Sequence, residues 1–272
     1  MTEDADTRTD SPSTGGVKAV ETSLTIVEAL REMGGGRVTD VVDRTGLSKG
    51  AVYKHLTTLT AHDLVVKEGN DYHLGFRFLD YGGWLRSRYV GSELIKPQMR
   101  ELADQTGEVA HFAIREKGRV ITLFRENGTQ GVFTRTRLGR RLHLHQTAGG
   151  KTLLAHLSPS EAESIVASEG LPSATENTIT DEAELFAELE AVRERGFAVN
   201  REESTSGVVA VAVPLAPDDT VVGACSVAGP RHRMSDDRIE GELVDLLSSV
   251  VTELELNITH SHGPVGKFCP RE

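Results

Sequence analysis

Apolar residues recur along residues 17–74 with the spacing of a small helical domain. In the first helix they stand three or four residues apart, at Val17, Val20, Leu24, Val27 and Leu30. The glycine run 34–36 ends this helix. A second, short helix is expected to start at Thr39 as its N-cap and to end at Thr45 and Gly46.

The third helix has two different faces. Ser48 is expected to cap it, and Val52, Leu56 and Leu59 form one apolar stripe. The opposite side and the helix start carry small, polar or cationic residues: Ser48, Lys49, Gly50, Tyr53, Lys54 and Thr57. Such a face suits the major groove of DNA, which the second helix of a helix-turn-helix enters.

A hairpin follows the three helices, because the apolar runs 64–66 and 72–74 flank the turn residues 68–71. The combination predicts a winged helix-turn-helix over residues 17–76. A helix pair with a glycine turn also occurs in proteins that never touch DNA. The added hairpin favours the DNA-binding interpretation.

The second half of the chain alternates predicted strands and helices in the manner of an α+β domain. The hairpin 109–125 turns at Glu116–Gly118, and strands are expected over 208–215 and 221–227. A capping box at Ser158 opens a helix that ends at Gly170, Thr180 opens another that ends at Gly196, and a last helix covers about 236–258. This segregation favours an antiparallel sheet flanked by helices.

Composition indicates an acidic two-domain protein in which one segment is nearly neutral. The 272 residues carry a net charge of −11, yet residues 17–90 hold ten bases and nine acids. A segment that escapes the acidic bias is where an acidic protein would contact phosphates. Arginine outnumbers lysine by 22 to 8, which together with the acid excess is typical of proteins from a salt-rich, haloarchaeal cytoplasm.

Several classes of protein find no support in the sequence. We find no membrane-spanning apolar run and no secretory leader, so a cytoplasmic location without membrane contact is expected. Cys225 and Cys269 cannot form a disulfide framework, and Cys225 is expected in the core. Gly150-Lys151-Thr152 ends like a phosphate-binding loop but has His145 where the first glycine must be. No catalytic motif and no cofactor motif appears.

Several separate motifs resemble the IclR family of transcriptional regulators. They are VETSLTIVEAL and the stretch from TDVVDRTGLSKGAVYKHL to LDYG near the N-terminus, then LHLHQTAGGKTLLAHL, ERGFAVNREESTSGVVAVAVPL and GACSVAGPRHRM. The resemblance runs from about residue 17 to about residue 258. It implies a linker helix over 77–91 and a GAF-like effector-binding domain over 92–258. Residues 1–16 and 259–272 are expected to be a disordered head and tail.

An effector site is expected at the start of the helix that contains Leu153 and Leu154. Gly149 and Gly150 there would expose backbone N–H groups to an anion, although glycines at this place also suit close helix packing. By resemblance, the site consists of Ala148, Gly149, Gly150, Asn200, Ala210, Ser226 and Ala228. Alanine at 210 and 228 replaces the Cys and Ser frequent in the family, so the ligand cannot be inferred from relatives. His143 and His145 could share a metal with an acid elsewhere, but histidines without a metal are more common in such places, and no metal is predicted. With His111 they are the second place to seek a ligand.

The sequence therefore predicts a transcription regulator that binds a palindromic operator in double-stranded DNA as a homodimer or dimer of dimers. A small-molecule effector, an organic acid or a sugar derivative, would control operator affinity from the C-terminal domain. Two alternatives remain open. The C-terminal domain could be unliganded and purely dimerising, or it could be a small-molecule enzyme with an appended helix-turn-helix.

Overall fold

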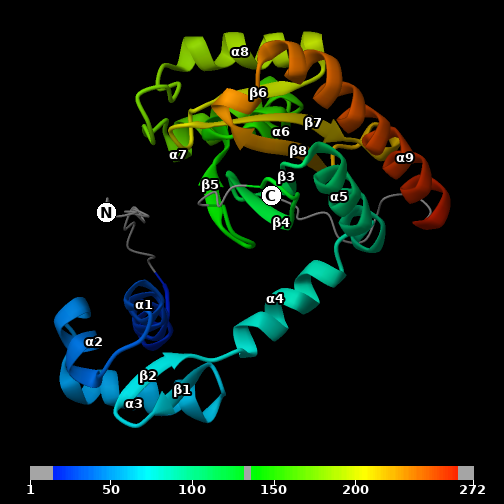
Figure 1. The fold of residues 1–272 in the computed structure, drawn as a ribbon. Helices are drawn as coiled ribbons and strands as arrows, with labels where there is room; N and C mark the ends of the chain where they lie inside the picture. The colour runs from blue at the N-terminus through cyan, green and yellow to red at the C-terminus, as the bar shows by residue number, and fades with distance from the viewer. Residues whose placement is uncertain (1–14, 132–135, 263–272) are drawn as a thin grey trace. The chain divides into compact units, whose positions relative to one another are not determined.

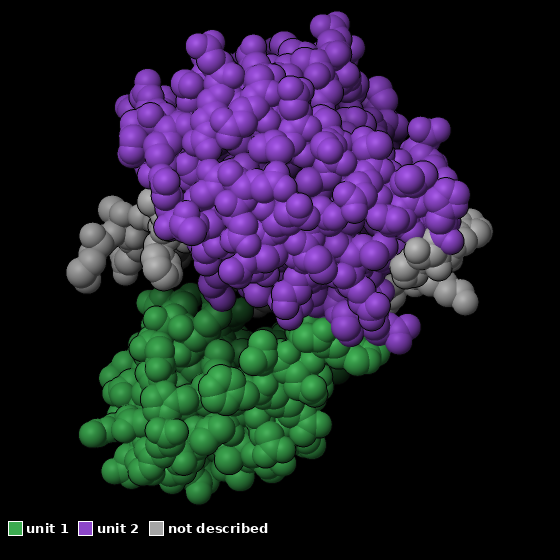
Figure 2. All heavy atoms as spheres, turned by 45° about the vertical axis from the view of Figure 1, so that its right-hand side comes forward, with its two compact units in different colours: residues 1–84 green, residues 85–272 purple. Residues whose placement is uncertain are grey.

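The computed structural model describes residues 15–131 and 136–262. The chain divides into two compact units, residues 1–84 and residues 85–272, which Figure 2 shows in different colours. Most of the predicted disordered head and tail, including Cys269, lies outside the described residues.

In its described residues, unit 1 contains helices α1 to α3, a two-stranded antiparallel sheet and the first part of α4 (Arg77–Ser87) (Figure 1). The elements are α1 (Lys18–Met33), α2 (Val38–Thr45), α3 (Lys49–Ala61), β1 (Val65–Glu68) and β2 (Asp71–Leu74). One apolar cluster joins them, formed by Ile26, Leu30, Val41, Val52, Leu56, Leu59, Val65 and Tyr72. The predicted winged helix-turn-helix is confirmed.

Two details of unit 1 differ from the sequence expectation. Helix α2 begins at Val38, because the Asp40 carboxylate accepts the Arg37 N–H at 2.8 Å and makes Arg37 the N-cap; the predicted N-cap at Thr39 is wrong. In α1, Val20 and Leu24 are 56% and 48% exposed. The predicted apolar stripe is therefore buried only near the end of the helix, since residues 18–25 contribute no buried side chain.

Helix α4 (Arg77–Ser87) occupies the place of the predicted linker helix and ends four residues earlier than expected. None of its side chains is buried. A turn follows in which Tyr89 is buried and its hydroxyl donates to the Val222 carbonyl.

Unit 2 is built on a six-stranded sheet in the order β5-β4-β3-β8-β7-β6, antiparallel at every junction. The strands are β3 (Val109–Glu116), β4 (Arg119–Asn127), β5 (Arg141–His143), β6 (Ala198–Arg201), β7 (Val208–Leu215) and β8 (Gly223–Pro230). The helices are α5 (Ser92–Thr106), α6 (Ala148–Ala155), α7 (Pro159–Glu169), α8 (Glu182–Arg195) and α9 (Val244–His262). The predicted α+β class with an antiparallel sheet flanked by helices is confirmed.

The two faces of the sheet have separate cores (Figure 1). One face packs on α5 and α9 through Phe112, Val211, Cys225 and Val227. The other packs on α6, α7 and α8 through Ala113, Val120, Ala198 and Ala224. Cys225 is buried as expected, and burial raises the pKa of its thiol.

Element boundaries in unit 2 depart from the sequence expectation at three places. Helix α8 begins at Glu182, because the Asp181 side chain accepts the Glu184 N–H; Thr180 is not its cap. Strand β8 covers Gly223–Pro230 rather than 221–227. The last helix begins at residue 236 as expected, passes through the π-helical residues Arg238–Leu243, and continues as α9 to His262, four residues past its expected end.

A buried carboxylate fixes the start of β3. Glu108 is 1% exposed, and the Arg233 guanidinium donates to both of its oxygens at 2.7 Å. Arg238 donates to the same carboxylate at 3.2 Å. A Cβ at Gly229 would lie 2.6 Å from Glu108 Oε2, so glycine there lets β8 pass this ion pair.

Candidate DNA-binding and effector sites

The structure places the predicted DNA-contact residues together on the exposed side of α3. The Ser48 hydroxyl accepts the Ala51 N–H at 3.3 Å and caps the helix. Val52, Leu56 and Leu59 are buried, which turns the opposite face outward. That face carries exposed Lys49, Gly50, Tyr53, Lys54 and Thr57.

The charge on this face is entirely positive. Residues 49–61 contain no Asp or Glu, whereas Lys49 and Lys54 are both exposed. The hairpin between β1 and β2 has Glu68 and Asp71 beside its turn. Phosphate contacts are therefore better served by α3 than by the tip of the hairpin.

The predicted effector residues lie on the sheet face that packs on α6. Strand register aligns Asn200, Ala210 and Ala228 in one row across β6, β7 and β8. The next row on this face contains Ser226, with His111 as its partner on β3 and Arg125 as the partner of His111 on β4. Residues from five strands thus meet on one face of the sheet.

The start of α6 differs from the simple anion cradle that the sequence suggested. Thr147 caps the helix, and its hydroxyl accepts the Gly150 N–H at 2.9 Å, so this N–H is already occupied. A Cβ at Gly150 would lie 2.2 Å from the Leu144 carbonyl oxygen, so glycine is needed there for close packing of the backbone. The N–H groups of Ala148 and Gly149 have no hydrogen-bond partner within the described residues.

Asn200 uses its side-chain amide inside the protein. Its Nδ2 donates to the Gln146 carbonyl, and its Oδ1 accepts the Glu203 N–H at 3.0 Å. Asn200 is 2% exposed. These contacts make it a positioning residue that ties β6 to the turn before α6.

His111 and Arg125 are partners across β3 and β4 that the sequence pattern does not predict. His111 is 7% exposed, and neither its Nε2 nor the Arg125 Nε has a hydrogen-bond partner within the described part of the chain. Burial, followed by the charge of Arg125, lowers the pKa of His111 from 6.5 to about 3. A buried polar atom without a partner costs about 1 to 3 kcal/mol, which calls for an explanation at this site.

Acid should destabilise unit 2 through His111. The imidazole of His111 takes up a proton near pH 6.5 in the unfolded chain but only near pH 3 in the folded chain. The contribution of His111 to the free energy of unfolding is therefore complete above pH 6.5 and falls as the pH drops. From pH 6.5 to 5 we expect a loss of about 2 kcal/mol. Urea denaturation at both pH values would measure it. His111→Leu should remove this part of the pH dependence and the exposed His232→Leu should not; equal profiles for His111→Leu and the parent would contradict the assignment.

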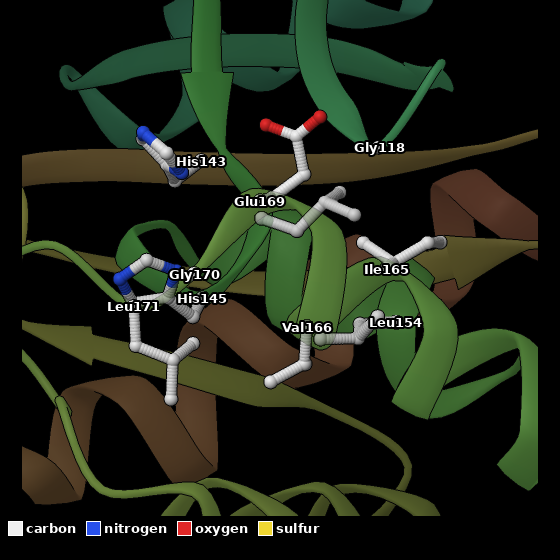
Figure 3. Close-up of a pocket in the computed structure, with 10 residues that line it drawn as sticks. Gly118, His143, His145, Leu154, Ile165, Val166, Glu169, Gly170 and Leu171 are labelled. Atoms are coloured by element: carbon white, nitrogen blue, oxygen red, sulfur yellow. The ribbon is translucent and has the colours of Figure 1, made fainter. Parts of the chain in front are cut away.

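His143 and His145 line a separate small pocket, where a short 3-10 helix, η1 (Leu144–Gln146), follows β5 (Figure 3). In the figure, both rings lie on the side of Leu171, across from Ile165 and Leu154. His145 Nε2 lies 3.1 Å from the Pro172 carbonyl, and Glu169 pairs with Arg119 at 2.6 Å. Within the described residues, no three His, Cys, Asp or Glu side chains gather as metal ligands. We therefore give the two histidines no metal-binding role.

Lys151, part of the rejected phosphate-loop motif, is buried in an ion cluster. Its Nζ lies 2.9 Å from Glu203 Oε1 and 3.2 Å from Glu188 Oε1. The cluster joins α6, α8 and the loop after β6. The one signal for this ion cluster in the sequence is a lysine in the segment AGGKTLLA, whose other residues are mostly small or apolar.

The fold and the two sites define a helix-turn-helix transcriptional regulator with a C-terminal regulatory domain. A family model described as the IclR helix-turn-helix domain matches residues 19–69, and one described as the C-terminal domain of the bacterial transcriptional regulator IclR matches residues 91–255. The chain belongs to the IclR family. It is a DNA-binding regulator of transcription with an effector-binding domain, and not an enzyme.

Relatives of this chain support the same assignment. The HTH-type transcriptional repressor AllR of Escherichia coli strain K12 is 32% identical over 249 residues, 89% of this chain and 92% of AllR. The crystal structure of Thermotoga maritima IclR is similar, with a TM-score of 0.74, 25% identity and coverage of 88% of this chain and 98% of that one. The inducer-binding domain of a PobR double mutant from Acinetobacter, in complex with 3-hydroxy benzoic acid, has a TM-score of 0.55 and 26% identity over 60% of this chain and 96% of its own.

No helix within the described ranges is long and apolar enough to cross a membrane.

Proposed function

We propose that this regulator binds its operator as a homodimer and that a small organic acid controls operator affinity from the sheet face beside α6. The observation that carries the proposal is the row of Ser226, His111 and Arg125, in which two buried nitrogens have no partner among described residues. Such groups are costly unless a ligand satisfies them.

The charges of the site favour an acid over a neutral sugar derivative. Arg125 is partly buried and always positive, and burial alone lowers the pKa of its guanidinium. His111 is neutral at physiological pH and offers Nε2 as a directional hydrogen-bonding atom. A carboxylate would receive a charge-assisted hydrogen bond from Arg125, with Ser226 and the N–H groups of Ala148 and Gly149 as further donors. The 3-hydroxy benzoic acid bound by the PobR domain agrees with this class.

A dimer is supported by apolar side chains that unit 1 leaves exposed. Val20 and Leu24 of α1 are 56% and 48% exposed, and Leu79 of α4 is 68% exposed. Exposed apolar side chains on helices are typical of an interface with a second copy. Two α3 helices would then read two halves of a palindromic operator. Sedimentation equilibrium of the full chain tests this assembly.

A regulator that binds chromosomal DNA would be located in the cytoplasm.

The effector site is tested by calorimetric titration with a panel of aromatic, keto and sugar acids, alongside their neutral analogues. For the acid that binds, Arg125→Met should weaken affinity by about 1.5 to 3 kcal/mol, the value of a hydrogen bond to a charged group, and Ser226→Ala by about 0.5 to 1.5 kcal/mol. The same acid should change operator affinity in the parent and lose this effect in Arg125→Met.

Two outcomes would contradict the proposal. Tight binding of a neutral analogue that Arg125→Met does not alter would refute the acidic ligand class. A parent that binds none of the panel and whose operator affinity no metabolite extract changes would favour the alternative, a purely dimerising C-terminal domain.

A further inference from the structure

A second hollow in unit 2 lies at the opposite end of α6 from the proposed effector site. It is an open groove with about 390 Å³ of free space, its mouth included. The residues that matter for its chemistry come from four places in the sequence: Tyr89, Arg115, Leu153, His156, Leu157 and Val222. None of them belongs to the rows of Ser226 and Ala228.

Arg115 supplies a positive charge to this groove. It is half-buried, and its guanidinium makes no hydrogen bond or ion pair within the residues that the structure describes. The charge of Arg115 contributes, after the hydrogen bonds from Ser158, to lowering the pKa of Glu161, whose carboxylate accepts the Ser158 hydroxyl at 2.6 Å as part of the α7 cap. Arg119, Arg141 and Arg195 of the same unit, by contrast, each pair with a glutamate.

His156 adds a second polar group beside Arg115. Its Nδ1 lies 2.8 Å from the Thr152 carbonyl, and since a carbonyl only accepts, Nδ1 carries the proton. Nε2 remains as the ring nitrogen that can accept a hydrogen bond, or donate one when the ring is charged. Leu153, Leu157 and Val222 form apolar walls next to these two groups.

We propose that this groove is a second ligand site that binds a small monocarboxylic acid with an apolar body. One guanidinium matches one carboxylate, and its planar fork can donate two parallel hydrogen bonds to it. The leucine and valine side chains that line the groove suit the apolar body of a ring or a short chain. A phosphate dianion would bring two charges to a single cation and leave the apolar walls without a partner.

One residue that lines the groove, Tyr89, follows α4 closely in the sequence. Tyr89 stands two residues after the end of α4, donates its hydroxyl to the Val222 carbonyl, and has its ring 5.9 Å from that of Phe112. A ligand in the groove contacts both Tyr89 and Val222 and thereby stabilises the arrangement in which the hydrogen bond between these two residues is formed. The site thus gives the regulator a second small-molecule input, independent of the effector at Ser226.

The test uses 4-fluorobenzoate as a probe and ¹⁹F NMR on the full chain. The parent is expected to bind it, and Arg115→Met should raise the dissociation constant about tenfold or more, as expected for the loss of one charge-assisted pair. His111→Leu, which alters the other site, should leave the constant unchanged. The neutral 4-fluorobenzyl alcohol should not compete.

Circular dichroism checks that each variant is folded. Leu157→Trp, which fills the groove and keeps Arg115, must also reduce binding, so the test does not depend on one substitution. Loss of binding in His111→Leu alone would place the probe in the effector site and overturn the proposal. A parent that binds no probe at millimolar concentration would overturn it as well, without affecting the proposed control by another acid at Ser226.

Discussion

Lys151→Met is expected to lower the free energy of unfolding of unit 2 by about 3 to 5 kcal/mol, the usual cost of removing one partner from a buried ion pair. Lys151 is 1% exposed and Glu203 is 6% exposed, so water cannot replace the lost ammonium group. Burial already raises the pKa of Glu203 against the opposing effect of Lys151. Without the lysine that carboxyl should take up a proton more readily, which makes the loss smaller in mild acid than at neutral pH.

Urea denaturation of the full chain, followed by a probe in unit 2, measures this change. The double variant Lys151→Met/Glu203→Gln should recover much of the stability, because no unpaired carboxylate is left beside α6. The exposed Lys96→Met is the matched control and should stay within about 0.5 kcal/mol of the parent. If Lys151→Met costs no more than Lys96→Met, the ion cluster contributes nothing to the fold.

Lys54→Ala is expected to weaken operator binding by about 1 to 3 kcal/mol per chain, and thus by about 2 to 6 kcal/mol for a dimer on two half-sites. Lys54 is exposed on the face of α3 opposite the buried Val52 and Leu56. Because no acid stands on α3, its charge is fully available to a phosphate or a base edge. Folding should be unchanged, since the side chain contributes nothing to the cluster around Leu56.

The measurement is fluorescence anisotropy at matched salt, on an operator located by footprinting upstream of the regulator's own gene. Lys96→Ala, in the C-terminal domain, is the control for a lost surface charge and should bind like the parent. Equal operator affinity of Lys54→Ala and the parent would show that α3 is not the recognition helix.

The sequence by itself predicted the winged helix-turn-helix closely, because its signals are local. The stripe of Val52, Leu56 and Leu59, the Ser48 cap and the glycine-containing turn of the hairpin each lie within one or two turns of chain. The capping box at Ser158 was equally visible and is formed as expected. Where several polar residues precede a helix, the local pattern does not single out one cap: it predicts Thr39 and Thr180, whereas Arg37 and Asp181 cap α2 and α8.

Only the tertiary structure decided which polar residues of unit 2 act together. Arg125, His111 and Ser226 become neighbours because β4, β3 and β8 pair in one register, with a shift between Phe112 and Ala113. A change of register by one residue would turn Ser226 to the opposite face. Lys151 likewise meets Glu203 only after α6 has packed on the sheet. Periodicity reports which face of an element is buried, whereas pairing between distant strands depends on long-range packing that no local pattern contains.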